Sequence, residues 1–140
     1  MEFNYYLRLD GIKGESKATG HSGEIELLSY SMEQGNIAIH SGSGSATKQS
    51  VHIHTMHITK KMDLTTVKLM EYSASGKRIP TGKITIEKVL KDGSTKPFVI
   101  IDLEDITIPS YQPDQGVMQD GLPIGAFTID FAKIKWAVKS

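Results

Sequence analysis

The sequence predicts a mainly β fold: a β-barrel of long, coiled antiparallel strands with one α-helix, in a single domain over residues 1–140. Apolar and polar residues alternate along most of the chain, which is the period of half-buried strands. In three of these stretches the apolar phase shifts by one residue, so each strand bulges or changes the face that it buries. Such strands favour a curled barrel over a flat sheet. Helical spacing of apolar residues occurs in one stretch, residues 64–75.

The strands follow one another with clear boundaries. Alternating apolar residues from Phe3 to Leu9 predict the first strand, and a turn-rich stretch over residues 11–23 follows it. The three phase shifts fall after Leu27, between Ile53 and Met56, and after Phe131. We therefore expect the chain to bend or to change its pairing partner at these points.

A tight hairpin is predicted at Lys91-Asp92-Gly93-Ser94, because an Asp-Gly pair tolerates the positive φ angles of a primed turn. It joins a strand over residues 84–90 to one over residues 98–108. No internal repeat or domain boundary is visible. The segment over residues 41–50 is rich in glycine and serine and predicts a flexible, exposed loop.

The predicted helix has recognisable ends. Asp63 is placed to accept hydrogen bonds from its first amides, and Gly76 suits the left-handed conformation after its last turn. The apolar residues with helical spacing are expected to dock on the barrel. They are Leu64, Val67, Met70 and Ala74.

The composition excludes several classes of function. Lys plus Arg and Asp plus Glu are 16 each, so the net charge is zero, which argues against nucleic-acid binding and polybasic membrane contact. The absence of cysteine excludes disulfides, thiolate nucleophiles and cysteine metal sites. No stretch is long enough to cross a bilayer, and the amino terminus does not resemble a signal peptide. The expectation is a protein that folds in the cytosol without inserting in a membrane, and that leaves the cell, if it does, by a signal-independent route.

The histidines offer the main chemical alternative. His52 and His54 would share one strand face, with His57 on the other, so a metal-dependent hydrolase is one hypothesis. Surface or lumen-lining histidines are the favoured interpretation, because a metal site needs three or four ligands. His21 is expected to hydrogen-bond within its own turn, near Glu15 and Ser22. We predict no catalytic, metal or cofactor site.

Two further patterns are interpreted in the same way. The segment from Gly42 to Lys48 lacks the glycine and lysine spacing of a phosphate loop and is better explained as a contact loop. Asp102 and Glu104 share a strand face, where paired carboxylates can perform acid–base chemistry. A solvated strand face is the commoner explanation for such a pair.

Six segments, in order, are similar to one known family. They are residues 6–16, YLRLDGIKGES; 23–31, GEIELLSYS; 58–63, ITKKMD; 69–70, LM, followed by 75–77, SGK; 103–106, LEDI; and 127–134, FTIDFAKI. These segments resemble the Hcp family, the haemolysin-coregulated proteins. The family often has a tryptophan-glycine pair after its second strand, where this chain has Met32-Glu33-Gln34-Gly35. The chain also ends at Ser140, without the carboxy-terminal toxin domain of some members.

The resemblance implies a structural protein and not an enzyme. It implies a homohexameric ring that stacks into the inner tube of a type VI secretion system, inside a contractile sheath and below a spike. Sheath, spike and baseplate proteins and secreted effectors are the implied partners. The tube would assemble in the cytoplasm and be expelled to the outside, and effectors could travel in its lumen. The alternative is a monomeric β-barrel that acts as a binding or adaptor module, which the mass in solution would distinguish.

Within such a ring we expect two groups of contact residues. Inter-subunit or inter-ring contacts are assigned to the loop and to the side of the helix away from its docking stripe: Gly42, Gly44, Lys48, Leu69 and Tyr72. Lumen or cargo contacts are assigned to polar residues in segments that match the family: Ser31, Ser110, Gln119 and Asp120.

Overall fold

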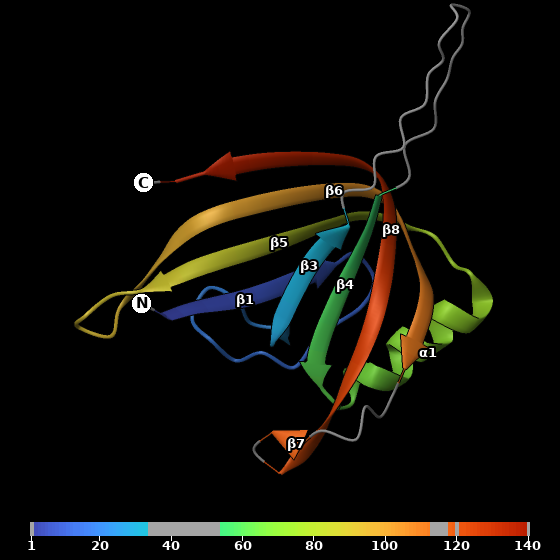
Figure 1. The fold of residues 1–140 in the computed structure, drawn as a ribbon, viewed down its shortest axis with the longest axis horizontal. Coiled ribbons are helices and arrows are strands. Elements are labelled where there is room, and N and C mark those ends of the chain that lie inside the picture. Colours follow the sequence, from blue (N-terminus) through green and yellow to red (C-terminus); the bar gives the residue numbers. More distant parts are fainter. Residues whose placement is uncertain (1, 34–53, 113–117, 120, 140) are drawn as a thin grey trace, which may run out of the picture.

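The structure is a computed structural model that describes residues 2–33, 54–112, 118–119 and 121–139 (Figure 1). The described residues form eight strands and one helix, as the sequence predicted for a mainly β fold. The strands are β1 Glu2–Leu9, β2 Ile25–Leu27, β3 Ser29–Glu33, β4 His54–Lys61, β5 Ile79–Val89, β6 Thr95–Gln112, β7 Met118–Gln119 and β8 Leu122–Val138. The helix, α1, is Thr65–Ser75.

The sheet curls until its two ends meet. Its order is β2-β1-β5-β6-β8-β4-β3, with β7 pairing β8, and neighbouring strands are antiparallel. β2 and β3 lie at opposite ends of this order, yet only Leu28 separates them in the chain. The Leu28 amide donates to the Thr59 carbonyl oxygen at 2.8 Å, where the chain leaves β1 and joins β4. The predicted phase shift after Leu27 is this change of partner.

A second bend crosses β5, β6 and β8. In β8 the alternation breaks after Phe131, as predicted, and in β6 both Leu103 and Ile106 are buried, on either side of Asp105. Asp105 has a φ of 61°, a left-handed conformation that re-aims the strand. Figure 1 shows β6 and β8 turning sharply along their length. The third predicted shift, between Ile53 and Met56, begins outside the described residues.

The bend divides the barrel into two walls. One, the β4 wall, consists of β3, β4 and the parts of β6 and β8 over residues 106–112 and 122–131. The other, the β5 wall, consists of β1, β2, β5 and the parts of β6 and β8 over residues 95–104 and 133–138. The core lies between their inner faces. Its fully buried members include Leu7, Met56, Ile58, Leu69, Ile79, Ile84, Ile101, Ile106 and Ile129.

The hairpin and both helix ends are confirmed, but the turn is not of the predicted primed type, because Gly93 has a positive φ and Asp92 does not. Gly93 has a φ of 87° between β5 and β6, and the Ser94 amide donates to Asp92 Oδ1 at 2.9 Å. The Thr65 amide donates to Asp63 Oδ1 at 3.0 Å, and Gly76 ends α1 with a φ of 69°. The Lys60 ammonium, fully buried, donates to Asp63 Oδ1 at 2.7 Å and so ties the start of α1 to β4.

The prediction of which side of α1 docks on the barrel is wrong. The residues of α1 that pack against the barrel are Thr65, Thr66, Leu69 and Tyr72. Their burial is possible because the threonine hydroxyls have partners: Thr65 Oγ1 donates to the Lys13 carbonyl oxygen at 3.4 Å, and Tyr111 donates to Thr66 Oγ1 at 3.2 Å. The buried side of the helix carries two threonines, one leucine and one tyrosine, so it has fewer apolar residues at helical spacing than the opposite side. The apolar pattern alone therefore pointed to the wrong side.

Candidate functional site

A row of polar residues crosses the outer face of the β4 wall. Ser31 lies opposite His57, His57 opposite Thr128, and Thr128 opposite Ser110, so four strands contribute one residue each. We call these four residues the polar row. Ser31, His57 and Ser110 are exposed and Thr128 is half-buried. The fold thus brings two of the predicted lumen residues, Ser31 and Ser110, onto one face.

The hydroxyl groups of this face bond to one another. Ser110 Oγ lies 2.9 Å from Thr128 Oγ1, and in the adjacent row Ser29 Oγ lies 2.6 Å from Thr59 Oγ1. A shallow hollow of about 230 Å³ lies over His57 and Ser110. Because the serine and threonine side chains are short, and two pairs of them are already bonded, the face offers hydrogen bonds but little apolar area to a protein that touches it. Such a surface suits weak, reversible contact.

The other predicted residues fall in less informative places. Gln119 belongs to β7, a two-residue strand whose backbone pairs with Leu122 and Pro123. Its side chain is not described. Asp120, Gly42, Gly44 and Lys48 lie outside the described residues, and their contacts stay predictions.

The exposed side of α1 is the one that was expected to be buried. Leu64, Val67 and Met70 are 81%, 59% and 41% exposed, and we call them the α1 stripe. Leu69 is fully buried and Tyr72 nearly so within the protomer. A side chain without exposed area has none to bury against a neighbour, so the premise for assigning Leu69 and Tyr72 to a subunit contact is lost. The surface that α1 presents is the α1 stripe.

A second apolar surface lies at the end of β8. Among the described residues, β4 pairs with β8 only as far as Phe131, and no described strand pairs with that edge of β8 over residues 132–138. Trp136 is 49% and Val138 70% exposed there, beside the half-buried Ile134. We call these three residues the β8 end. Figure 1 shows α1 and the carboxy terminus on opposite sides of the molecule.

A buried histidine ties the turn before β2 to the β5 wall. His21 Nε2 lies 2.5 Å from Glu87 Oε2, and Nδ1 lies 2.9 Å from Glu24 Oε1. The Tyr6 ring stacks on the imidazole with centroids 4.1 Å apart. Burial lowers the pKa of His21, but hydrogen bonds to Glu87 and Glu24 outweigh it, so its pKa is raised above the ordinary value. Burial and the Glu87 carboxylate raise the pKa of Tyr6.

Sequence reasoning placed His21 in the right kind of setting but with the wrong partners. Its partners are Glu24 and Glu87 in place of Glu15 and Ser22. Glu24, three residues away, could have been found from spacing. Glu87 could not, because it reaches His21 only through the pairing of β1 with β5.

The described residues hold no group of three or more histidines or carboxylates arranged for a metal ion. His52 lies outside them, and His54 is described only as backbone in β4. No described helix is long and apolar enough to cross a membrane.

Comparison with known proteins gives matches over nearly the whole chain. A family model described as "Type VI secretion system effector, Hcp" matches residues 6–138. Protein hcp1 of Pseudomonas aeruginosa is 30% identical over 135 residues, which cover 96% of this chain and 82% of that protein.

Solved structures share the fold. Hcp1 from Salmonella typhimurium has a TM-score of 0.77 at 23% identity, with 100% of this chain and 88% of that chain covered. Another type six secretion system protein has a TM-score of 0.78 at 25% identity, with coverage of 96% and 83%.

Proposed function

This chain belongs to the Hcp family of type VI secretion proteins, and we propose that it forms hexameric rings that stack into the expelled inner tube of the secretion system. The family is one of secreted, structural tube proteins and not of enzymes. Its sheath, spike, baseplate and effector partners are proposed here on the strength of that membership.

The observation that carries the ring proposal is the presence of two unlike apolar surfaces on opposite sides of one protomer. The α1 stripe and the β8 end differ in shape and in secondary structure. A two-fold dimer buries the same patch on both subunits, whereas two different patches fit a head-to-tail interface that closes by rotation. We therefore assign the subunit contact to the α1 stripe of one protomer and the β8 end of the next.

The aromatic ring of Trp136 is the natural centre of this contact. Tryptophan is enriched among residues whose truncation costs most in interfaces, and here it lies half-exposed, beside an edge of β8 that no described strand pairs. Val67, in the middle of the α1 stripe, is the matching centre on the other surface. Burying both removes apolar surface that an isolated protomer leaves in water.

The polar row is proposed to face the lumen. A channel that carries a protein must hold it without trapping it, and short, mutually bonded hydroxyls provide that balance. Ser31 on β3 and Ser110 on β6 then contact cargo from the two ends of the row. Replacing Ser31 by arginine should reduce cargo retention and leave the ring intact.

The test exploits the two-sided interface. Wild-type protein should have the mass of a hexamer in solution and appear as rings in electron micrographs. Val67→Glu damages one surface and Trp136→Glu the other, so each variant alone should be monomeric. Mixed together, they should form a heterodimer through the one pair of undamaged surfaces. Thr19→Glu, in an exposed turn, is the matched control and should keep the ring.

A wild-type protein that stays monomeric at every concentration would instead support the monomeric adaptor. Mixed variants that stay monomeric, with the rings of the wild type intact, would show that the ring uses other surfaces.

A further inference from the structure

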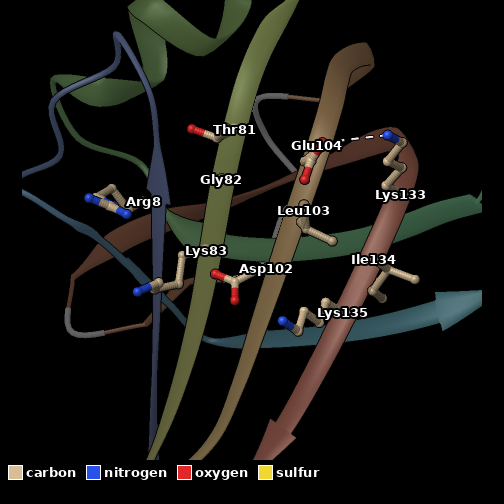
Figure 2. Close-up of a pocket in the computed structure, with 10 residues that line it drawn as sticks. All are labelled: Arg8, Thr81, Gly82, Lys83, Asp102, Leu103, Glu104, Lys133, Ile134 and Lys135. Carbon is tan, nitrogen blue, oxygen red and sulfur yellow. Dashed lines mark ion pairs between the residues drawn. The ribbon is translucent and has the colours of Figure 1, made fainter.

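The outer face of the β5 wall carries a row of charged side chains in which cations outnumber anions. Arg8 lies opposite Lys83, Lys83 opposite Asp102, and Asp102 opposite Lys135, on four adjacent strands. They line a shallow hollow of about 540 Å³ (Figure 2). Three inter-strand spacings of about 4.8 Å give the row a length of about 14 Å. We call these four residues the charged row.

The charged row is unfavourable for the isolated chain. Arg8 and Lys83 are directly opposite each other on β1 and β5, and like charges in that relation destabilise a sheet. Neither they nor Lys135 form an ion pair with any described residue.

The row next to the charged row contributes no net negative charge to the hollow. There Lys133 Nζ lies 3.9 Å from Glu104 Oε1, and Figure 2 shows this pair at the edge of the hollow. The hollow therefore holds four cationic side chains against two carboxylates, although the whole chain is neutral. This face therefore carries a local excess of positive charge.

We propose that the charged row binds an acidic segment of a partner protein. Carboxylates of the partner would lie over Arg8 and Lys83 at one end and over Lys135 at the other, and would relieve the repulsion at the first. Asp102, between them, would accept a cationic side chain or repel an anion. The row is only about 14 Å long and Asp102 interrupts its cations, which favours a short acidic protein segment over a long polyanion such as nucleic acid.

This surface is separate from the proposed subunit contact. Side chains of successive residues in a strand point to opposite faces, so Lys135 lies on the outer face of the wall and Trp136 on the inner one. Ring formation through the β8 end and binding at the charged row can accordingly succeed or fail independently.

The experiment measures binding of a fluorescent oligo-glutamate peptide to the full chain, in the assembly state in which it is purified, by fluorescence anisotropy. Replacing Arg8, Lys83 and Lys135 together by glutamine should weaken binding about tenfold, because three exposed ion pairs are lost. Asp102→Asn should tighten it about twofold, since the variant removes the one carboxylate inside the row. Binding to the wild type should weaken as salt is added.

The matched control replaces three exposed lysines elsewhere by glutamine: Lys17, Lys68 and Lys91. It removes the same total charge and should change binding less than about twofold, because exposed charges farther apart than a Debye length interact weakly. An equal loss in the control, no binding by the wild type, or weaker binding by Asp102→Asn would overturn the proposal. Tighter binding of a short DNA duplex at the same residues would overturn it too, in favour of nucleic acid.

Discussion

His21 should make the stability of this protein fall as the pH rises. The imidazole faces two carboxylates, Glu24 and Glu87, at hydrogen-bond distance. Only the protonated ring has an N–H on both nitrogens, so a neutral ring leaves one carboxylate facing a lone pair. The native pKa of His21 is raised, whereas in the unfolded chain it is about 6.5. The stabilisation is therefore complete below about pH 6.5 and is lost as the pH passes through the raised native pKa.

The size of the effect follows from what His21→Ala removes. Glu87 is 6% exposed and would lose its hydrogen-bond partner, a loss of about 1.5–3 kcal/mol for a hydrogen bond to a charged group. Losing the stacked ring against Tyr6 adds about 0.5–1.5 kcal/mol. The Glu24 side chain is more exposed than that of Glu87, so in the variant water can replace much of the hydrogen bond that Glu24 loses. We expect a total of roughly 3 kcal/mol at pH 6, a large part of the 5–15 kcal/mol that holds a domain folded.

The assay is urea unfolding between pH 5.5 and about 8.5, the range in which histidines titrate. Wild-type stability should decline across this range, and His21→Gln should remove the decline. His57→Gln, on the exposed outer face of β4, is the control and should retain it. Adding Glu87→Leu to His21→Ala should recover part of the loss, because no buried charge is then left without a partner. A His21→Ala variant within about 0.5 kcal/mol of the wild type at pH 6, or the same pH slope in His21→Gln, would refute this reasoning.

Two other substitutions test the packing directly by urea unfolding. In the monomeric Trp136→Glu background, Leu69→Ala should cost roughly 2–5 kcal/mol because its side chain is fully buried. Val67→Ala, on the exposed side of α1, should cost less than about 0.5 kcal/mol in the same background, and equal costs would mean that α1 packs by its other side. Gly14→Ala should cost about 2 kcal/mol, because a Cβ there would lie 2.3 Å from the Glu24 carbonyl oxygen and force the turn open. The amide hydrogens of this turn should then exchange faster. Unchanged stability would show that the turn is looser than its geometry indicates.

The candidate site could be predicted from the sequence only in outline. Ser31 and Ser110 were chosen through the resemblance to the Hcp family, and their presence in one row with His57 and Thr128 required the strand registers. Of the charged row, the sequence singled out only Asp102, because it shares a strand face with Glu104. The cations opposite Asp102 are Lys83 and Lys135, which come from other strands, as does Arg8 beyond Lys83. Facing residues on different strands obey no spacing rule within the chain.

The sequence by itself determined what depends on neighbours along the chain. Strand alternation, the Asp92-Gly93 turn and both ends of α1 follow from residues a few positions apart, and so did the phase shifts after Leu27 and Phe131. Only the tertiary structure decided which side of α1 is buried, because the apolar count favoured Val67 and Met70, while the hydrogen bonds of Thr65 and Thr66 to distant groups favoured the other side. Local geometry is set by covalent neighbours, but burial is set by whatever the folded chain brings alongside.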